Sequence, residues 1–168
     1  MITSQLAILD QGRNYLTNIN DTHYCEVKSP LFSSSAGTHF RHVLDHYLAL
    51  MHRPQGIINY NIRHRFSKAE SSTQAALVVI DDIAHWLLQL NGQDLQENVQ
   101  VISEIAVDEV QNAETTSTLA RELVFVSSHA VHHYSIIKVI STLQNVSLPA
   151  DFGIAPATAS FQRSQAAS

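Results

Sequence analysis

The chain has 168 residues, which is the size of one ordinary domain with its own hydrophobic core. Hydrophobic residues make up 45% of it and charged residues 15%, which argues against disorder because such a chain can bury enough apolar surface to fold. The net charge of −5 offers no electrostatic attraction to nucleic acid or to an anionic membrane, and we expect neither as a partner.

Cysteine content and the lack of targeting signals indicate the compartment. The single cysteine, Cys25, excludes an internal disulfide framework and a multi-cysteine metal site. No stretch approaches the roughly 18 consecutive apolar residues of a membrane helix. Residues 1–10 lack the basic and then apolar pattern of a secretory signal. We therefore expect a cytoplasmic protein.

The first half of the chain predicts two helices. Apolar residues at helical spacing predict the first over residues 2–19, and residues 21–30 are predicted as a loop. One of Ser33, Ser34 and Ser35 is expected to cap a second helix that runs to about Met51. The Pro and Gly of residues 53–56 end it.

The next segment predicts a third helix and a strand. Ser67 and Glu70 have the spacing of a capping box, which predicts a helix from there to Asn91, with Asn91 and Gly92 as its left-handed C-cap. Residues 99–107 then alternate between apolar and polar side chains, which predicts a short strand or hairpin.

The last helix has the most regular pattern. One of Thr115, Thr116 and Ser117 is expected to cap it. Its core positions follow at steps of four and three: Leu119, Leu123, Val126, Ala130, His133, Ile137 and Ile140. Four long helices predict an all-α four-helix bundle over residues 1–147. Residues 148–168 are predicted as a C-terminal arm, which Phe152 and Phe161 would hold against the bundle.

Histidine is the unusual residue of this chain. There are ten histidines, as many as all lysines and arginines together. His133 takes a core position of the last helix, and His129 lies one turn earlier on nearly the same face. Their imidazoles would be about 6 Å apart along the helix axis, which allows both to reach one metal ion at about 2.1 Å. His132 points about 100° away from this face and is not expected to be a ligand.

A third ligand would have to come from the second helix. His39, His42 and His46 share one face there, and spacing alone does not choose among them. Asp45 is expected to orient an imidazole through its second nitrogen. His46 or Tyr134 is expected to carry protons if it faces the cavity.

Two further features lie around these helices. Glu122, which lies seven residues before His129, is expected to support the site or close its floor. The densest basic cluster is Arg63, His64 and Arg65, and it is not long enough to indicate nucleic-acid binding. A polar core network of hydrogen-bonded histidines explains the spacing as well as a metal site does. The sequence has no Gly-rich phosphate loop, HExxH or GxSxG motif.

The histidine motifs resemble those of a known family. The string from His129 to His133 is similar to the last-helix motif of the DinB/YfiT-like family, and His42 followed by Asp45 is similar to its second-helix motif. The resemblance covers about residues 2–145 and implies a four-helix bundle whose metal ligands are His42, His129 and His133. It also implies a homodimer that acts as a thiol-dependent transferase or isomerase. Tyr134 stands where many relatives carry a basic residue, and His39 and His46 keep the second-helix ligand open.

The function we expect is that of a divalent-metal-dependent enzyme acting on a small-molecule substrate. Three imidazoles suit zinc, nickel or iron equally, and a low-molecular-weight thiol is the cofactor that the resemblance implies. The alternative is a non-catalytic bundle that binds a metal or a small ligand.

Overall fold

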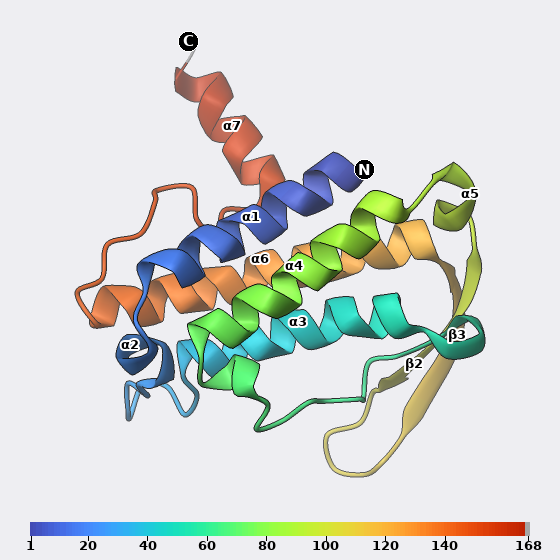
Figure 1. Ribbon diagram of the computed structural model, residues 1–168, viewed down its shortest axis with the longest axis horizontal. Coiled ribbons are helices and arrows are strands. Elements are labelled where there is room, and N and C mark those ends of the chain that lie inside the picture. Colours follow the sequence, from blue (N-terminus) through green and yellow to red (C-terminus); the bar gives the residue numbers. More distant parts are fainter. Residues whose placement is uncertain (167–168) are drawn as a thin grey trace.

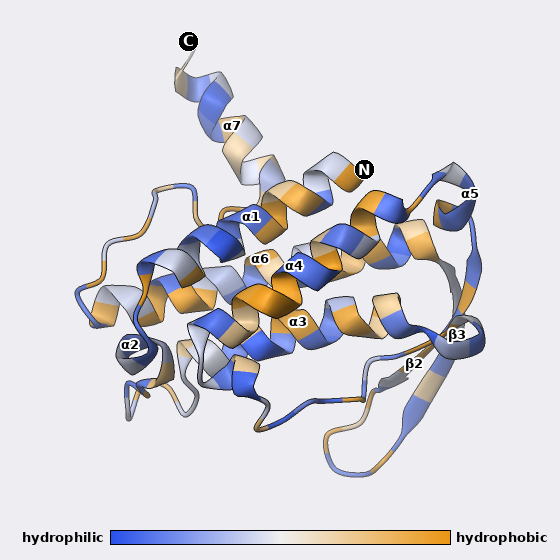
Figure 2. Ribbon diagram, viewed as in Figure 1, coloured by the Kyte–Doolittle hydropathy of each residue, from blue (hydrophilic) through white to orange (hydrophobic). Residues whose placement is uncertain are grey.

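Four long helices form the body of the molecule (Figure 1). They are α1 (Ile2–Asn18), α3 (Ala36–His52), α4 (Thr73–Gln89) and α6 (Leu119–Leu143). The computed structural model describes residues 1–166. In it α3 packs against α6 and α4, while α1 packs against α4 and α6. Apolar and polar positions recur along each of these helices, as amphipathic packing requires (Figure 2).

Shorter helices join these four, so residues 1–166 contain seven α-helices. The others are α2 (Asp21–Cys25), α5 (Gly92–Leu95) and α7 (Pro156–Ala166), with two 3-10 turns, η1 (Pro54–Gly56) and η2 (Lys68–Glu70). The predicted loop at residues 21–30 therefore begins with α2. Asn20 caps this helix by accepting from the backbone N–H of His23. The four long helices that the sequence predicts are present, and short helices and a small sheet accompany them.

A small sheet lies at one end of the helices. Its order is β1-β2-β3, with β1 (Ile57–Asn59) parallel to β2 (Asn98–Glu104) and β2 antiparallel to β3 (Asn112–Thr118). The strand expected at residues 99–107 ends at Glu104. Val99 and Val101 are buried, whereas Ile105 is 60% exposed beyond the end of the strand.

Of the four helix caps predicted from the sequence, one is confirmed and three are wrong. Ser35 caps α3 by accepting from the N–H of Thr38, as expected. The capping box at Ser67 is wrong, because Ser67 makes no side-chain cap and α4 begins at Thr73 behind Ser72. The C-cap at Asn91 and Gly92 is also wrong, since Asn91 caps the start of α5. The cap of α6 is Thr118, one residue after the expected three.

The arm after α6 is attached through a buried aromatic ring and through hydrogen bonds of its backbone to Gln11, Ser135 and Lys138. Phe152 is 3% exposed and stacks on Tyr15 and Tyr134, with ring centroids 5.6 and 5.2 Å away. Phe161 is 63% exposed in α7, so it is not a buried anchor of the arm, contrary to expectation. The boundary at residue 148 stays a prediction. Among residues 1–166, no helix combines the length and hydrophobicity needed to cross a membrane.

Candidate metal centre

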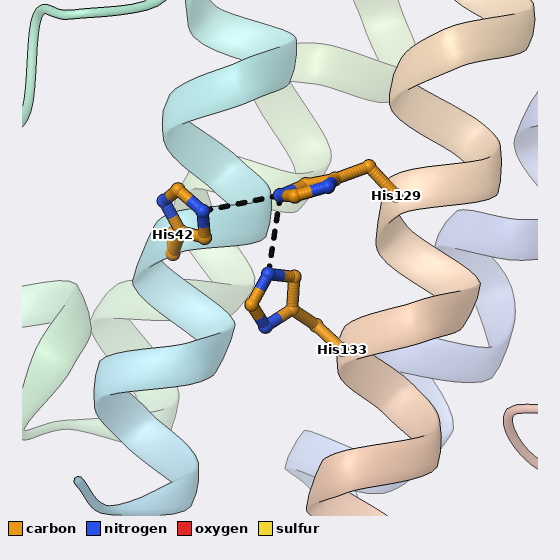
Figure 3. A group of neighbouring side chains, drawn as sticks. All are labelled: His42, His129 and His133. Atoms are coloured by element: carbon orange, nitrogen blue, oxygen red, sulfur yellow. Dashed lines mark hydrogen bonds between the residues drawn. The ribbon is translucent and has the colours of Figure 1, made fainter. Parts of the chain in front are cut away.

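The packing of α3 against α6 brings three histidines together. Figure 3 shows His42 on α3 facing His129 and His133 on α6. The Nε2 atom of His129 lies 3.1 Å from Nε2 of His42 and 3.1 Å from Nε2 of His133. One nitrogen of each ring lies within 4.8 Å of the other two. In residues 1–166 it is the one group of three histidine, cysteine or carboxylate side chains this close.

The three nitrogens fit a metal ion. Two ligands at about 2.1 Å from a tetrahedral ion lie about 3.4 Å apart, so the two nitrogen pairs at 3.1 Å are within a few tenths of an ångström of that spacing. Three imidazoles are a donor set that zinc, nickel and iron all accept. The residues present therefore suit a divalent ion of this group.

The electrostatics of the cluster favour neutral rings. Burial lowers the pKa of His42 to about 2, that of His129 to about 4 and that of His133 to about 3. Burial is the largest cause of each of these pKa shifts. The positive charges of neighbouring histidines, when protonated, make up the rest, together with the charge of Arg63 for His42 and His129. Near neutral pH each ring therefore keeps a nitrogen lone pair, the form that binds metals.

His39 and His46 surround the cluster without joining it. Nδ1 of His39 lies 3.0 Å from Nδ1 of His133, so it contacts the nitrogen that points away from the cluster. Nδ1 of His46 donates to the carbonyl oxygen of His42 at 3.0 Å, and the His46 ring stacks on His129 with centroids 4.2 Å apart. Both residues thus orient cluster rings, which is the usual role of groups around a metal site.

Asp45 does not orient His42, and that prediction is wrong. Its carboxylate is buried and accepts from Arg41 at 2.9 Å and from the ring of His64 at 2.8 Å. The outward nitrogen of His42, Nδ1, instead accepts from Nη1 of Arg63 at 2.8 Å. Arg63 is the site residue that sequence reasoning missed, and its place in the densest basic cluster was the available signal.

Glu122 contacts the site indirectly, through Tyr60. It is 1% exposed and accepts from the hydroxyl groups of Tyr60 at 2.7 Å and Ser117 at 2.6 Å. The Tyr60 ring stacks on His46 with centroids 5.1 Å apart. Tyr134 is fully buried between Phe40 and Phe152, so it does not face the cavity and the condition for it to carry protons is not met.

A pocket of about 230 Å³ adjoins the cluster. Its lining includes the rings of His46, Tyr60 and Phe125 together with the charged residues Arg63, Arg65 and Glu104. A larger pocket of about 820 Å³ lies between α6 and the segment around α7, and its lining includes His132 but none of the three clustered histidines. None of the three clustered histidines lines the smaller pocket either, but its lining includes Arg63, which contacts His42, and His46 and Phe125, which stack on His129. The smaller pocket therefore adjoins the candidate metal centre.

Comparison with known proteins identifies the fold of this chain. No family model matches the chain. A curated protein of Rhizopus delemar named FK506-binding protein 5 is 31% identical over 102 residues, which span 61% of this chain but 26% of that protein. The crystal structure of a DinB-like protein (YjoA) from Bacillus subtilis is similar with a TM-score of 0.64 at 15% identity, covering 90% of this chain and 96% of that one. This likeness shows the fold alone: the chain folds as DinB-like proteins do.

Proposed function

We propose that this protein binds one divalent metal ion through Nε2 of His42, His129 and His133. The observation that carries the proposal is the convergence of three neutral imidazoles from two helices, with two contacts of 3.1 Å between their nitrogens. Placing three part-buried polar rings together costs free energy unless they gain partners, and a metal ion is the partner that satisfies all three at once.

We further propose that the metal centre is enzymatic. Three protein ligands leave one or more positions for water or substrate, unlike a structural zinc site with four protein ligands. A bound divalent ion lowers the pKa of a water or a thiol that it holds. The adjoining pocket gives a small molecule room beside the cluster. A thiol-dependent transferase or isomerase is the reaction class that the family resemblance suggests, and a homodimer is the assembly it suggests.

Metal analysis of protein purified without a histidine tag tests the site. We expect about one equivalent of zinc, nickel or iron per chain, and its loss in the His129→Ala/His133→Ala double variant. His85→Ala is the matched control, because His85 is exposed on α4 and lies outside the cluster. Circular dichroism verifies that each variant keeps its helices.

Two outcomes would contradict the site. One is stoichiometric metal that persists in the double variant. The other is metal-free protein whose melting temperature does not respond to added zinc, since an ion that binds the folded state must stabilise it. The second result would favour a non-catalytic histidine network. A screen of the metal-loaded protein with glutathione-like thiols tests the enzymatic part.

A further inference from the structure

The contact between Arg63 and His42 fixes where the proton of His42 resides. Nη1 of Arg63 lies 2.8 Å from Nδ1 of His42. A guanidinium group only donates hydrogen bonds, so Nδ1 of His42 must accept and carry a lone pair. The proton of the neutral ring is then on Nε2, the nitrogen that faces His129 at 3.1 Å.

This tautomer is the wrong one for a metal ligand. Binding a metal through Nε2 requires the lone pair on Nε2 and the proton on Nδ1. Nδ1–H and the guanidinium N–H would then be two donors facing each other. The contact between Arg63 and His42 and the ligation of a metal by His42 therefore exclude one another. In the metal-loaded protein, Arg63 needs a different acceptor.

The pocket beside the cluster is where such an acceptor would fit. Arg63 and Arg65 both line it, together with Asn61 and Ser103, and Glu104 is the carboxylate among its lining residues. Within residues 1–166, four other arginines lie within 4.0 Å of a carboxylate, but neither Arg63 nor Arg65 does. Asp45 and Glu104 act electrostatically on Arg63, but within the pocket lining two arginines stand against one carboxylate, which leaves a local excess of positive charge.

We propose that this pocket binds an oxyanion, such as the carboxylate of a substrate, through Arg63, and that the anion and the metal ion bind cooperatively. The anion draws the guanidinium away from His42, which frees His42 to change tautomer and ligate the metal. Because such coupling is reciprocal, the metal strengthens anion binding by the same factor. This inference rests on the metal site proposed above and adds a substrate class to it, namely small molecules that carry a carboxylate or a similar anion.

Zinc affinity measured by competition with a chelator tests the role of Arg63. In chloride buffer we expect Arg63→Gln to bind zinc about five- to tenfold more tightly than the wild type, the range expected for losing one charge-assisted hydrogen bond at an exposed site. A glutamine can accept from Nδ1–H through Oε1, so it suits the ligating tautomer. Arg65→Gln removes the same charge from the same pocket without touching His42, and we expect a change of about twofold or less.

Acetate tests the coupling itself. At equal ionic strength, replacing chloride with acetate is expected to tighten zinc binding by the wild type about threefold or more, and to leave Arg63→Gln unchanged. The chelator is calibrated in each buffer, because acetate itself binds zinc weakly. Arg163→Gln, in α7, controls for net charge.

The outcomes separate this inference from the metal site. Equal zinc affinity in the wild type and Arg63→Gln, or an acetate effect that survives in Arg63→Gln, overturns the coupling while leaving the metal site intact. Failure of the wild type to bind zinc overturns both. An Arg65→Gln effect as large as that of Arg63→Gln would assign the result to pocket charge and reject the role of the His42 contact.

Discussion

The neutral histidines of the cluster link metal binding to the pH dependence of folding. In the unfolded chain an imidazole binds a proton near pH 6.5. In the folded chain burial lowers the pKa of His42, His129 and His133 to about 4 or below. Below pH 6.5 the unfolded state therefore binds more protons than the folded state, and the stability of the metal-free protein falls as the pH falls.

Replacing all three clustered histidines with glutamine should remove much of this pH dependence. We expect metal-free wild type to lose more melting temperature between pH 7 and pH 5 than the triple variant does. The rings are partly exposed, so we take about 1 kcal/mol for the set, which corresponds to about 2–4 °C in a chain of this size. Thermal unfolding at both pH values in the presence of a chelator measures the difference.

His85→Gln provides the control for this experiment, because it removes one exposed histidine from α4. Its loss of melting temperature between the two pH values should match that of the wild type. If the triple variant also matches the wild type, the buried rings do not govern the acid sensitivity of the fold.

The site was predictable from sequence where it rests on one helix. His133 replaces a core residue of a regular apolar stripe, and His129 lies one turn earlier on nearly the same face, so the direction of both follows from the period of α6. The choice among His39, His42 and His46 depends on how α3 rotates against α6, which only tertiary packing decides. Arg63 lies 21 residues from His42 on a segment without periodicity, so no spacing rule connects the two.

The junction of α3 with η2 depends on close backbone contact at Gly37. A Cβ atom at this position would lie 2.1 Å from the carbonyl oxygen of Glu70 and 2.9 Å from the ring of Tyr24. The Glu70 carboxylate also accepts from Arg41 of α3 at 3.1 Å, so this junction joins the helix that carries His42 to the turn before α4.

Gly37→Ala should therefore destabilise the protein. Because the clash is with backbone that cannot rotate away, we expect a loss of about 2–3 kcal/mol, seen as a fall of roughly 5–10 °C in melting temperature. Gly92→Ala is the matched control, since no atom lies within 4 Å of its added Cβ. It should change stability by about 0.5 kcal/mol or less. Equal melting temperatures for the two variants would contradict the close packing at Gly37.

The elements that sequence patterns missed are those shaped by distant partners. Ser67 and Glu70 have the spacing of a capping box, but the Glu70 carboxylate is used by Arg41, 29 positions away. Strand β3 has no apolar alternation and forms because it pairs along its whole length with β2. Local signals predicted the amphipathic helices well, because a helix that buries one face has apolar residues at helical spacing in its sequence.

At the scale of the whole molecule, the fold constrains function only loosely. A TM-score of 0.64 at 15% identity means that the arrangement of helices persists while most side chains differ. Folds of this kind carry unrelated activities, and the chemistry is decided by the residues around the site. The pocket beside the cluster, with its two arginines and one carboxylate, is therefore more informative about substrate than the likeness to another DinB-like structure.

The contacts of α7 and of Phe152 predict which C-terminal residues the fold needs for its stability. Helix α7 contains no buried residue, whereas Phe152, just before it, is packed between Tyr15 and Tyr134. Removing residues 156–168 should leave the melting temperature within about 2 °C of the full chain, since little apolar surface is lost from the core.

Phe152→Ala should cost about 3–4 kcal/mol, or roughly 6–14 °C, because it empties a ring-sized site among aromatic side chains. Thermal unfolding of both variants makes the comparison, with metal content as a second readout that neither change should alter. A truncated chain that melts many degrees lower would show that α7 stabilises the fold through its own contacts, and the stable unit would then extend beyond the Phe152 anchor.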